Sequence, residues 1–208
     1  MLDYLDRMIA DGYGKSFTIG ALSTPVGGGT VVAIAQPHFL LGVPANVVVR
    51  PIYIDVALHA GISTADADET EAIIAVDSLG QWRGDGTFTV ETASNMNSKW
   101  DKGSISQAGS AFSANATTSP RNGAAAAAPV LDMELGRLVE TADQGGTAAN
   151  VAYRIRKLTY QPNYPPWLEG LCSLAIYVGG TVAVTAITIV QIVESSPETM
   201  RAYMKGEK

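Results

Sequence analysis

The sequence predicts an all-β protein, and three observations support this prediction. The last apolar run, from Leu171 to Val193, has no charged side chain and is rich in β-branched residues. Such residues are stiff at χ1 and favour a pleated strand. Short apolar segments recur along the chain between Gly- and Pro-containing breaks, a spacing typical of sandwiches and barrels. No long helical pattern interrupts them.

The final apolar run admits two interpretations. It is long enough for a membrane-spanning helix, which needs about 20 apolar residues. Its β-branched composition and the central Gly179-Gly180 pair favour a hairpin instead. We therefore expect strands at Cys172–Val178 and Thr181–Glu194, joined by a tight turn. The second strand should be central in a packed sheet, which makes the protein a soluble β-sandwich rather than a membrane protein.

Residues 1–15 form a predicted N-terminal arm. Leu2, Leu5 and Ile9 fall on one face of a short helix that Gly12 and Gly14 end. A helix of about ten residues is too short to stand alone in water. It must dock either on its own domain or on another subunit.

The other terminus, residues 195–208, carries a second helix signal. The segment Ser195-Ser196-Pro197-Glu198 supplies a Ser cap, a Pro in the first turn and a capping-box Glu, and Gly206 ends the helix.

The predicted strands fill residues 16–194. Ile52, Ile54, Val56 and Leu58 alternate with polar or small residues, as in a half-buried strand, and Pro51 should lie at an edge or a bulge because it lacks an amide donor. The remaining boundaries follow apolar runs between breaks: Ser16–Leu22, Thr30–Ala35, Phe39–Val43, Val47–Ala60, Glu71–Asp77, Phe88–Thr92, Val130–Thr141 and Ala148–Leu158.

Ala93–Ala128 is a Ser-, Ala-, Asn-, Thr- and Gly-rich segment and is expected to be a long loop. Eight strands in two sheets with long crossovers constitute an antiparallel jelly-roll sandwich. We therefore predict an eight-stranded jelly roll with short terminal helices and long loops.

Composition narrows the possible functions. Of 208 residues, 47% are apolar and only 16% are charged, whereas about a quarter is usual in soluble domains. Contacts with neighbouring subunits would cover such a surface; the alternative is a monomer with polar uncharged loops.

The net charge of −6 argues against nucleic-acid binding, and Arg154, Arg156 and Lys157 fit one solvated strand face. Cys172 stands alone, so no intramolecular disulfide forms, and Met1–Asp11 lacks the pattern of a secretory leader.

The sequence offers no catalytic set, metal site or cofactor motif. His38 and His59, the only histidines, have neither the number nor the spacing of a cupin metal site. The acidic segment Asp66–Glu71 lacks the further ligands of a calcium loop and is expected to be solvated, with calcium at a subunit contact as the alternative. Trp82, Trp100 and Trp167 lie in loops or at loop borders, where an aromatic packs under a loop, anchors an interface or stacks on a sugar.

The order of the turn and strand signals carries a resemblance. The turn Val43-Pro44-Ala45-Asn46 leads into Val47–Ile54, and a Ser/Ala/Gly-rich region follows. Tyr164-Pro165-Pro166-Trp167 then precedes Leu174–Val178 and the last β-branched strand. Over Phe17 to Val193, this order resembles the single jelly-roll virion proteins of bacteriophages. The resemblance implies a shell subunit, or a protein decorating or plugging the shell, that works through surfaces rather than through transferable functional residues.

We therefore expect a non-enzymatic structural protein of an icosahedral virion, assembled in the host cytoplasm from copies of itself and other virion proteins. No membrane or nucleic-acid partner is expected. The arms and long loops would form the contacts, with an interface set comprising Leu2, Leu5, Ile9, Trp82, Trp100 and Trp167. The alternative is the head of a phage spike or fibre that binds host glycans through the tryptophans. An enzyme is the third and least supported class.

Overall fold

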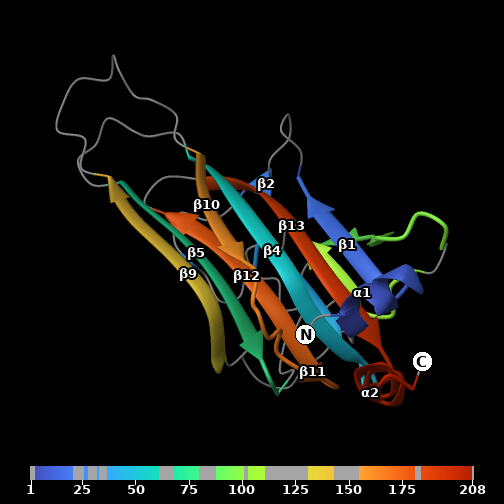
Figure 1. Cartoon of the computed structure of the whole chain (residues 1–208). Coiled ribbons are helices and arrows are strands. Elements are labelled where there is room, and N and C mark those ends of the chain that lie inside the picture. The colour runs from blue at the N-terminus through green and yellow to red at the C-terminus, as the bar shows by residue number, and fades with distance from the viewer. Residues whose placement is uncertain are drawn as a thin grey trace.

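The computed structural model describes residues 3–20, 26–27, 32, 37–60, 68–79, 88–100, 103–110, 131–142, 155–180 and 184–207. These residues form two antiparallel β-sheets and two short helices (Figure 1). The all-β prediction is confirmed. None of the described helices has the length and apolar character needed to span a membrane.

The first sheet has seven strands. Its spatial order is β10 (Ile155–Tyr160), β4 (Val48–Ala60), β13 (Val184–Ser195), β1 (Gly14–Ile19) and β7 (Ser94–Asn95). Two short strands lie off this path: β11 (Leu168–Glu169) pairs with β4, and β2 (Val26–Gly27) pairs with β13. The prediction that the last strand is central is confirmed, because β13 lies between β4 and β1.

The second sheet has six strands. Its order is β6 (Thr89–Glu91), β8 (Gln107–Ser110), β3 (Phe39–Val43), β12 (Cys172–Gly180), β5 (Asp68–Asp77) and β9 (Met133–Ala142). The described residues thus hold thirteen strands rather than the predicted eight. Two of the additional strands, β7 and β8, lie in the segment predicted to be a loop. Pairing of β8 with β3 and β6 holds these small residues extended despite their low strand propensity.

The predicted C-terminal hairpin is wrong. Gly179 and Gly180 continue β12, where they pair with Glu71 and Thr70 of β5, and do not form a tight turn. β13 belongs to the other sheet, so the two halves of the apolar run face each other across the sandwich. A continuous apolar run fits a strand buried on both faces as well as it fits a hairpin, and every residue of β12 is buried.

The prediction that Pro51 lies at an edge or a bulge is confirmed. Gln191 of β13 pairs with Tyr53, but the next residue, Ile192, pairs with Pro51, so Ile52 is the extra residue of a β-bulge. A bulge re-aims side chains. Ile54 packs in the main core, whereas Ile52 packs with the terminal helices outside it, so the predicted single face for these two residues is wrong.

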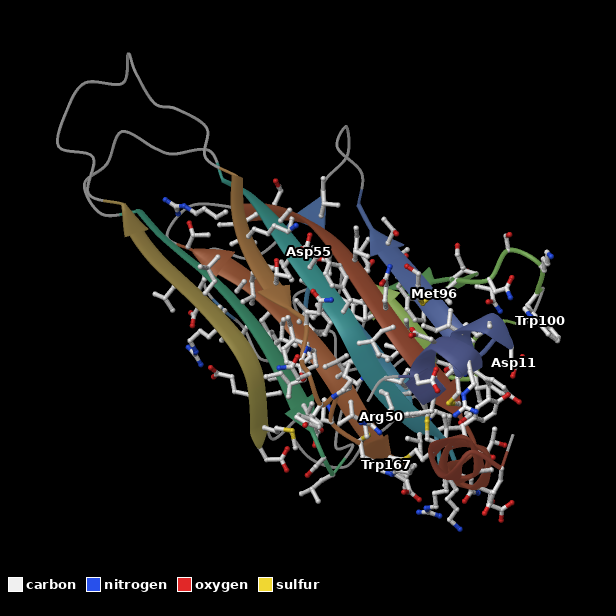
Figure 2. All side chains as sticks on the ribbon, viewed as in Figure 1. Asp11, Arg50, Asp55, Met96, Trp100 and Trp167 are labelled. Atoms are coloured by element: carbon white, nitrogen blue, oxygen red, sulfur yellow. The ribbon has the colours of Figure 1, made fainter. Side chains whose placement is uncertain are left out.

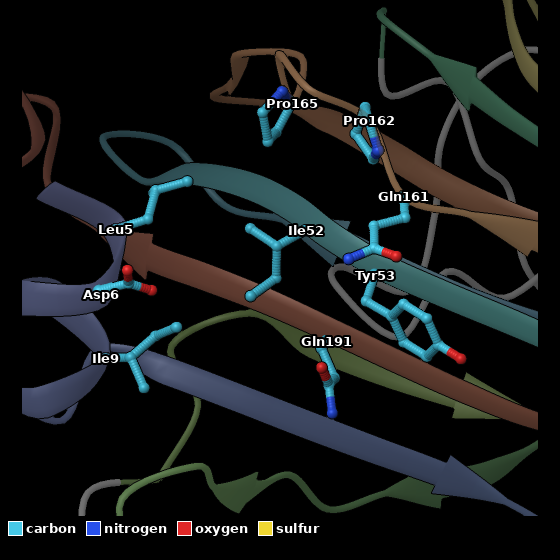
Figure 3. Close-up of a pocket in the computed structure, with 9 residues that line it drawn as sticks. All are labelled: Leu5, Asp6, Ile9, Ile52, Tyr53, Gln161, Pro162, Pro165 and Gln191. Carbon is cyan, nitrogen blue, oxygen red and sulfur yellow. The ribbon is translucent and has the colours of Figure 1, made fainter. Parts of the chain in front are cut away.

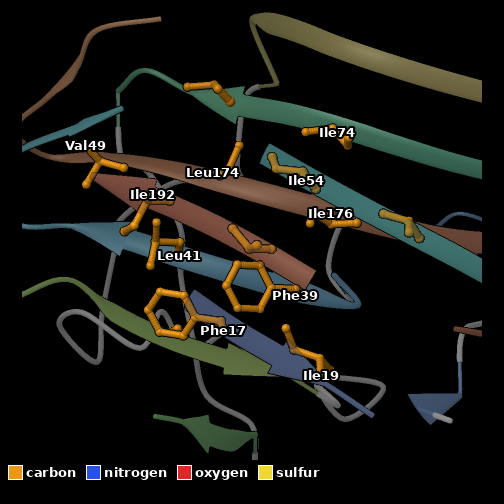
Figure 4. Close-up of a cluster of buried hydrophobic side chains, with 14 of the residues drawn as sticks. Phe17, Ile19, Phe39, Leu41, Val49, Ile54, Ile74, Leu174, Ile176 and Ile192 are labelled. Carbon is orange, nitrogen blue, oxygen red and sulfur yellow. The ribbon is translucent and has the colours of Figure 1, made fainter. Parts of the chain in front are cut away.

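The main core lies between the two sheets (Figure 4). Phe17 of β1 meets Phe39 of β3 across the sandwich, with ring centroids 5.7 Å apart. Leu41, Ile176 and Val190 are also fully buried there. Each such side chain contributes roughly 1.5–3 kcal/mol by leaving water.

A second apolar cluster covers the outer face of the six-stranded sheet. It contains Leu40, Ile73, Ala175 and Tyr177, among others, and Val32, Phe88 and Leu131 pack against it. Connecting segments therefore add a partial third layer on this side. This layer explains why both faces of β12 are apolar.

Both terminal helices form as predicted. α1 (Asp3–Ala10) buries Leu5 and Met8. α2 (Pro197–Lys205) begins at the N-cap Ser196, with Pro197 in its first turn, and ends at Gly206 in the left-handed conformation. Because the cap is Ser196 rather than Ser195, the third helical residue is Thr199, and the expected capping-box role of Glu198 is not fulfilled.

Candidate functional site

The two chain ends meet in one apolar cluster, which we call the terminal cluster. The helices α1 and α2 pack on each other and on the adjoining ends of β4 and β13 (Figure 2). Its buried members are Leu5, Met8, Val48, Val193, Met200 and Tyr203. Of the two docking options for the arm, α1 therefore uses its own domain within this chain, while contact with a neighbour remains a prediction.

Tyr203 fixes α2 to the chain that leaves α1. Its hydroxyl donates to the carboxylate of Asp11, and its ring meets Tyr13 edge-on, with centroids 5.9 Å apart. Burial, and then the bond to Asp11, raise the pKa of Tyr203 to about 12. The phenol therefore remains a neutral donor at physiological pH.

Trp167 holds the Pro-rich loop against β4 and α2. The guanidinium carbons of Arg50 and Arg201 each lie 5.6 Å from its ring centroid, a distance at which cation–π attraction acts. Its Nε1–H donates to Glu169 Oε2 at 2.6 Å, and Arg201 Nη2 lies 3.4 Å from the same oxygen. Buried Arg50 also donates to the carbonyl of Pro165. The indole is thus an anchor within the chain.

Trp100 closes the C-terminal end of α1. Its Nε1–H donates to the carbonyl of Ala10 at 2.9 Å, and Asn97 Nδ2 donates to the same oxygen at 2.6 Å. The ring lies over Gly12, where an added Cβ would come within 2.7 Å of Trp100 Cγ, and Gly12 has a φ of +85°. Trp100 nevertheless leaves 43% of its surface exposed.

Three of the six predicted interface residues, Leu5, Ile9 and Trp167, belong to the terminal cluster or pack against it. A fourth, Trp100, bonds to the end of α1. Leu2 and Trp82 lie outside the described residues. Sequence reasoning missed Tyr203, although its spacing of three from Met200 on a capped helix is a signal for one buried face.

A buried carboxylate, Glu194, fastens a loop beside this cluster. Its oxygens accept bonds from Ser104 Oγ at 3.1 Å, from the Ile105 amide at 2.7 Å and from the Ser106 amide at 3.0 Å. Three donors compensate for the removal of the carboxylate from water. Its place at the end of an apolar strand gives no sequence signal for this role.

Several exposed apolar side chains lie at the same end of the sandwich. Ser173 pairs with Asp77, so Leu171 and Leu79 both lie just beyond the shared end of β12 and β5. Leu171 has a φ of +22°, in the left-handed region that a leucine rarely adopts. Tyr164 of the Pro-rich loop and Met204 of α2 are exposed as well. We use the name apolar tip for these four side chains, Leu79, Tyr164, Leu171 and Met204, which are exposed by 61%, 71%, 50% and 52%.

The outer faces of the sheets carry ion pairs. Asp55 contacts Lys157 Nζ at 3.0 Å and accepts a bond from Thr159 at 2.8 Å. Arg156 is instead buried and donates to Thr70 of the opposite sheet at 2.6 Å. The expectation of a solvated face is therefore wrong for Arg156, because successive strand residues point to opposite sides. Arg154 lies outside the described residues.

The residues that the structure describes contain no group of three or more His, Cys, Asp or Glu side chains arranged to hold a metal ion. His38 is buried beside β3, and burial lowers its pKa to about 4. His59 lies near the end of β4 in the other sheet. Asp66 and Ala67, at the start of the acidic segment, lie outside the described residues.

No protein-family model, curated protein or solved structure matches this chain.

Proposed function

We propose that the chain is a jelly-roll structural subunit of an icosahedral virion. The observation that carries the fold part is the strand order. Eight of the described strands have five or more residues: β1, β3, β4, β5, β9, β10, β12 and β13. Numbered one to eight along the chain, they lie in the orders 1-8-3-6 and 2-7-4-5. A jelly roll arranges eight strands in two sheets as two Greek keys. The two strand orders support this arrangement.

The fold alone does not choose a function, because jelly rolls serve in capsids, lectins and cupins. The exposed side chains of the apolar tip and the low content of charged residues support the capsid role, since neighbouring copies would cover such side chains in a particle. The rigid body supplies the shape, and repeated small contacts supply the stability of a particle through multivalency. A shell subunit or a decoration or vertex protein fits these features equally.

The test is a measurement of assembly. The purified full-length chain is expected to form discrete symmetric oligomers or closed particles in analytical ultracentrifugation and negative-stain microscopy. Replacing Leu79 and Leu171 with serine should shift it toward monomers, whereas Val139→Ser, at an exposed position on β9, serves as the control. A chain that stays monomeric at millimolar concentration and is absent from purified virions by mass spectrometry would contradict the proposal.

The alternative function, glycan binding through Trp100 and Trp167, has less support than the structural role. The indole N–H groups of Trp100 and Trp167 are already donated to Ala10 and Glu169 within the chain. A saccharide would have to use the remaining exposed ring surface of each.

A further inference from the structure

A cavity of about 420 Å³ opens between α1, the Pro-rich loop and the outer face of the seven-stranded sheet (Figure 3). Its volume lies within the range of roughly 300–1,000 Å³ that small-molecule sites occupy. Ile9, Ile52 and Pro162 supply apolar surface, and Tyr53 supplies an aromatic ring. None of the described lining residues belongs to the apolar tip or is a tryptophan, although Pro165, whose carbonyl accepts a bond from Arg50, links the cavity to the Trp167 contacts.

The β-bulge builds part of this cavity. In an unbroken strand, Ile52 and Ile54 would share one face and both would enter the main core. The irregular register opposite Gln191 and Ile192 turns Ile52 out toward α1 instead. Bulges commonly re-aim a side chain beside a functional site. The same irregularity lies beside Tyr53 and Gln191, which also line the cavity.

Three polar side chains that line the cavity are not bonded to other described residues. The side chains of Asp6, Gln161 and Gln191 make no hydrogen bond or ion pair with the part of the chain that the structure describes. Each amide offers both donors and an acceptor, and the carboxylate offers acceptors only. Three hydrogen-bonding side chains thus line an apolar surface, with Asp6 and Gln161 exposed and Gln191 half-buried.

Charge narrows the class of ligand. Among the described residues that line the cavity, Asp6 alone is charged. Lys157, whose bonding partners include Tyr53, is paired with Asp55 at 3.0 Å and so carries little uncompensated charge toward a ligand. A phosphate or carboxylate would therefore meet a negative charge and, among the lining residues that the structure describes, no cation.

We infer that this cavity binds a neutral saccharide. The C–H face of a sugar ring fits against Tyr53, Ile52 and Pro162, as amphipathic ligands do on aromatic and apolar surfaces. Its hydroxyls donate to Asp6 and exchange bonds with Gln161 and Gln191. This inference goes beyond the proposed structural role and does not depend on it.

The test begins with the full-length protein on an array of neutral and acidic glycans, followed by calorimetric titration with the neutral glycan that gives the strongest signal. Gln161→Ala and Gln191→Ala are each expected to raise the Kd about tenfold. Gln107→Ala is the matched control, because Gln107 is an exposed strand glutamine outside the cavity, and its Kd should equal that of the wild type. Asp6→Asn should raise the signal of acidic glycans relative to neutral ones.

Three results would overturn the inference: no neutral glycan above background, a preference for acidic glycans in the wild type, or an unchanged Kd in both glutamine variants. Circular dichroism of each variant checks its fold, which these exposed or half-buried side chains do not support through hydrogen bonds. If the glutamine variants changed the sedimentation coefficient and left glycan binding intact, the cavity would be an assembly contact and not a saccharide site. Failure here leaves the proposed structural role untouched, because that role is measured by assembly.

Discussion

Protonation of His38 opposes folding. This residue is 3% exposed, and neither ring nitrogen has a hydrogen-bond partner among the described residues. Burial lowers its pKa from 6.5 to about 4, so the folded state binds the proton less readily than the unfolded state. The stability that neutral His38 permits is therefore fully present above pH 6.5 and is lost as the pH falls toward 4.

The variant His38→Leu should remove this part of the acid sensitivity. Between pH 7 and pH 4.5, linkage predicts that the wild type loses about 2–3 kcal/mol through His38, a loss that the variant lacks. Urea unfolding of both proteins at the two pH values measures the difference. Equal losses in the wild type and the variant would show that His38 finds a partner on protonation.

Glu194 illustrates a buried charge that is fully bonded. Glu194→Ala would leave the amides of Ile105 and Ser106 without their acceptor, and we expect a loss of about 2–4 kcal/mol in the free energy of unfolding. Limited proteolysis should then cut the chain near residues 103–106 sooner. Glu198→Ala, in the first turn of α2, is the control and should stay within about 0.5 kcal/mol of the wild type.

At the scale of elements, local signals were predictable and pairing was not. The N-cap, the first-turn Pro and the final Gly define α2 because each acts on its own backbone. Pro51 reveals a bulge because its missing N–H is a local property. The partner of β12 depends on which distant strands lie beside it, and an apolar run carries no such information.

The cap of α2 provides an element-scale prediction. Ser196→Ala removes the acceptor of the Thr199 amide bond of 3.2 Å and should cost about 1 kcal/mol. Ser98→Ala, at an exposed loop position, is the matched control. The two free energies of unfolding from urea titration should differ by that amount, and equal values would show that water replaces the cap at no cost.

At the scale of the whole molecule, the terminal cluster joins both ends of the chain. The sequence predicted one apolar face on α1 but not the residues that cover it. Those residues belong to α2 and β13, which lie more than 170 residues away along the chain. The interface role of the arm therefore has to be separated from its role in folding. Within one chain, Leu5 and Met8 already support Met200 and Tyr203.

Deletion of Met1–Gly14 makes that separation testable. Loss of the burial of Leu5 and Met8 should cost about 3–6 kcal/mol, and the deletion also removes the Asp11 bond and the Tyr13 contact of Tyr203. Against a usual total stability of about 5–15 kcal/mol, we expect the domain to stay folded at low temperature. Met200→Ala is the control, because it weakens the same cluster by about 2–5 kcal/mol and keeps the arm.

If the arm also contacts a neighbour, the deletion should abolish co-sedimentation with particles while Met200→Ala retains it. Normal incorporation of the deletion variant would confine the arm to folding, and equal loss in both variants would assign the defect to stability alone.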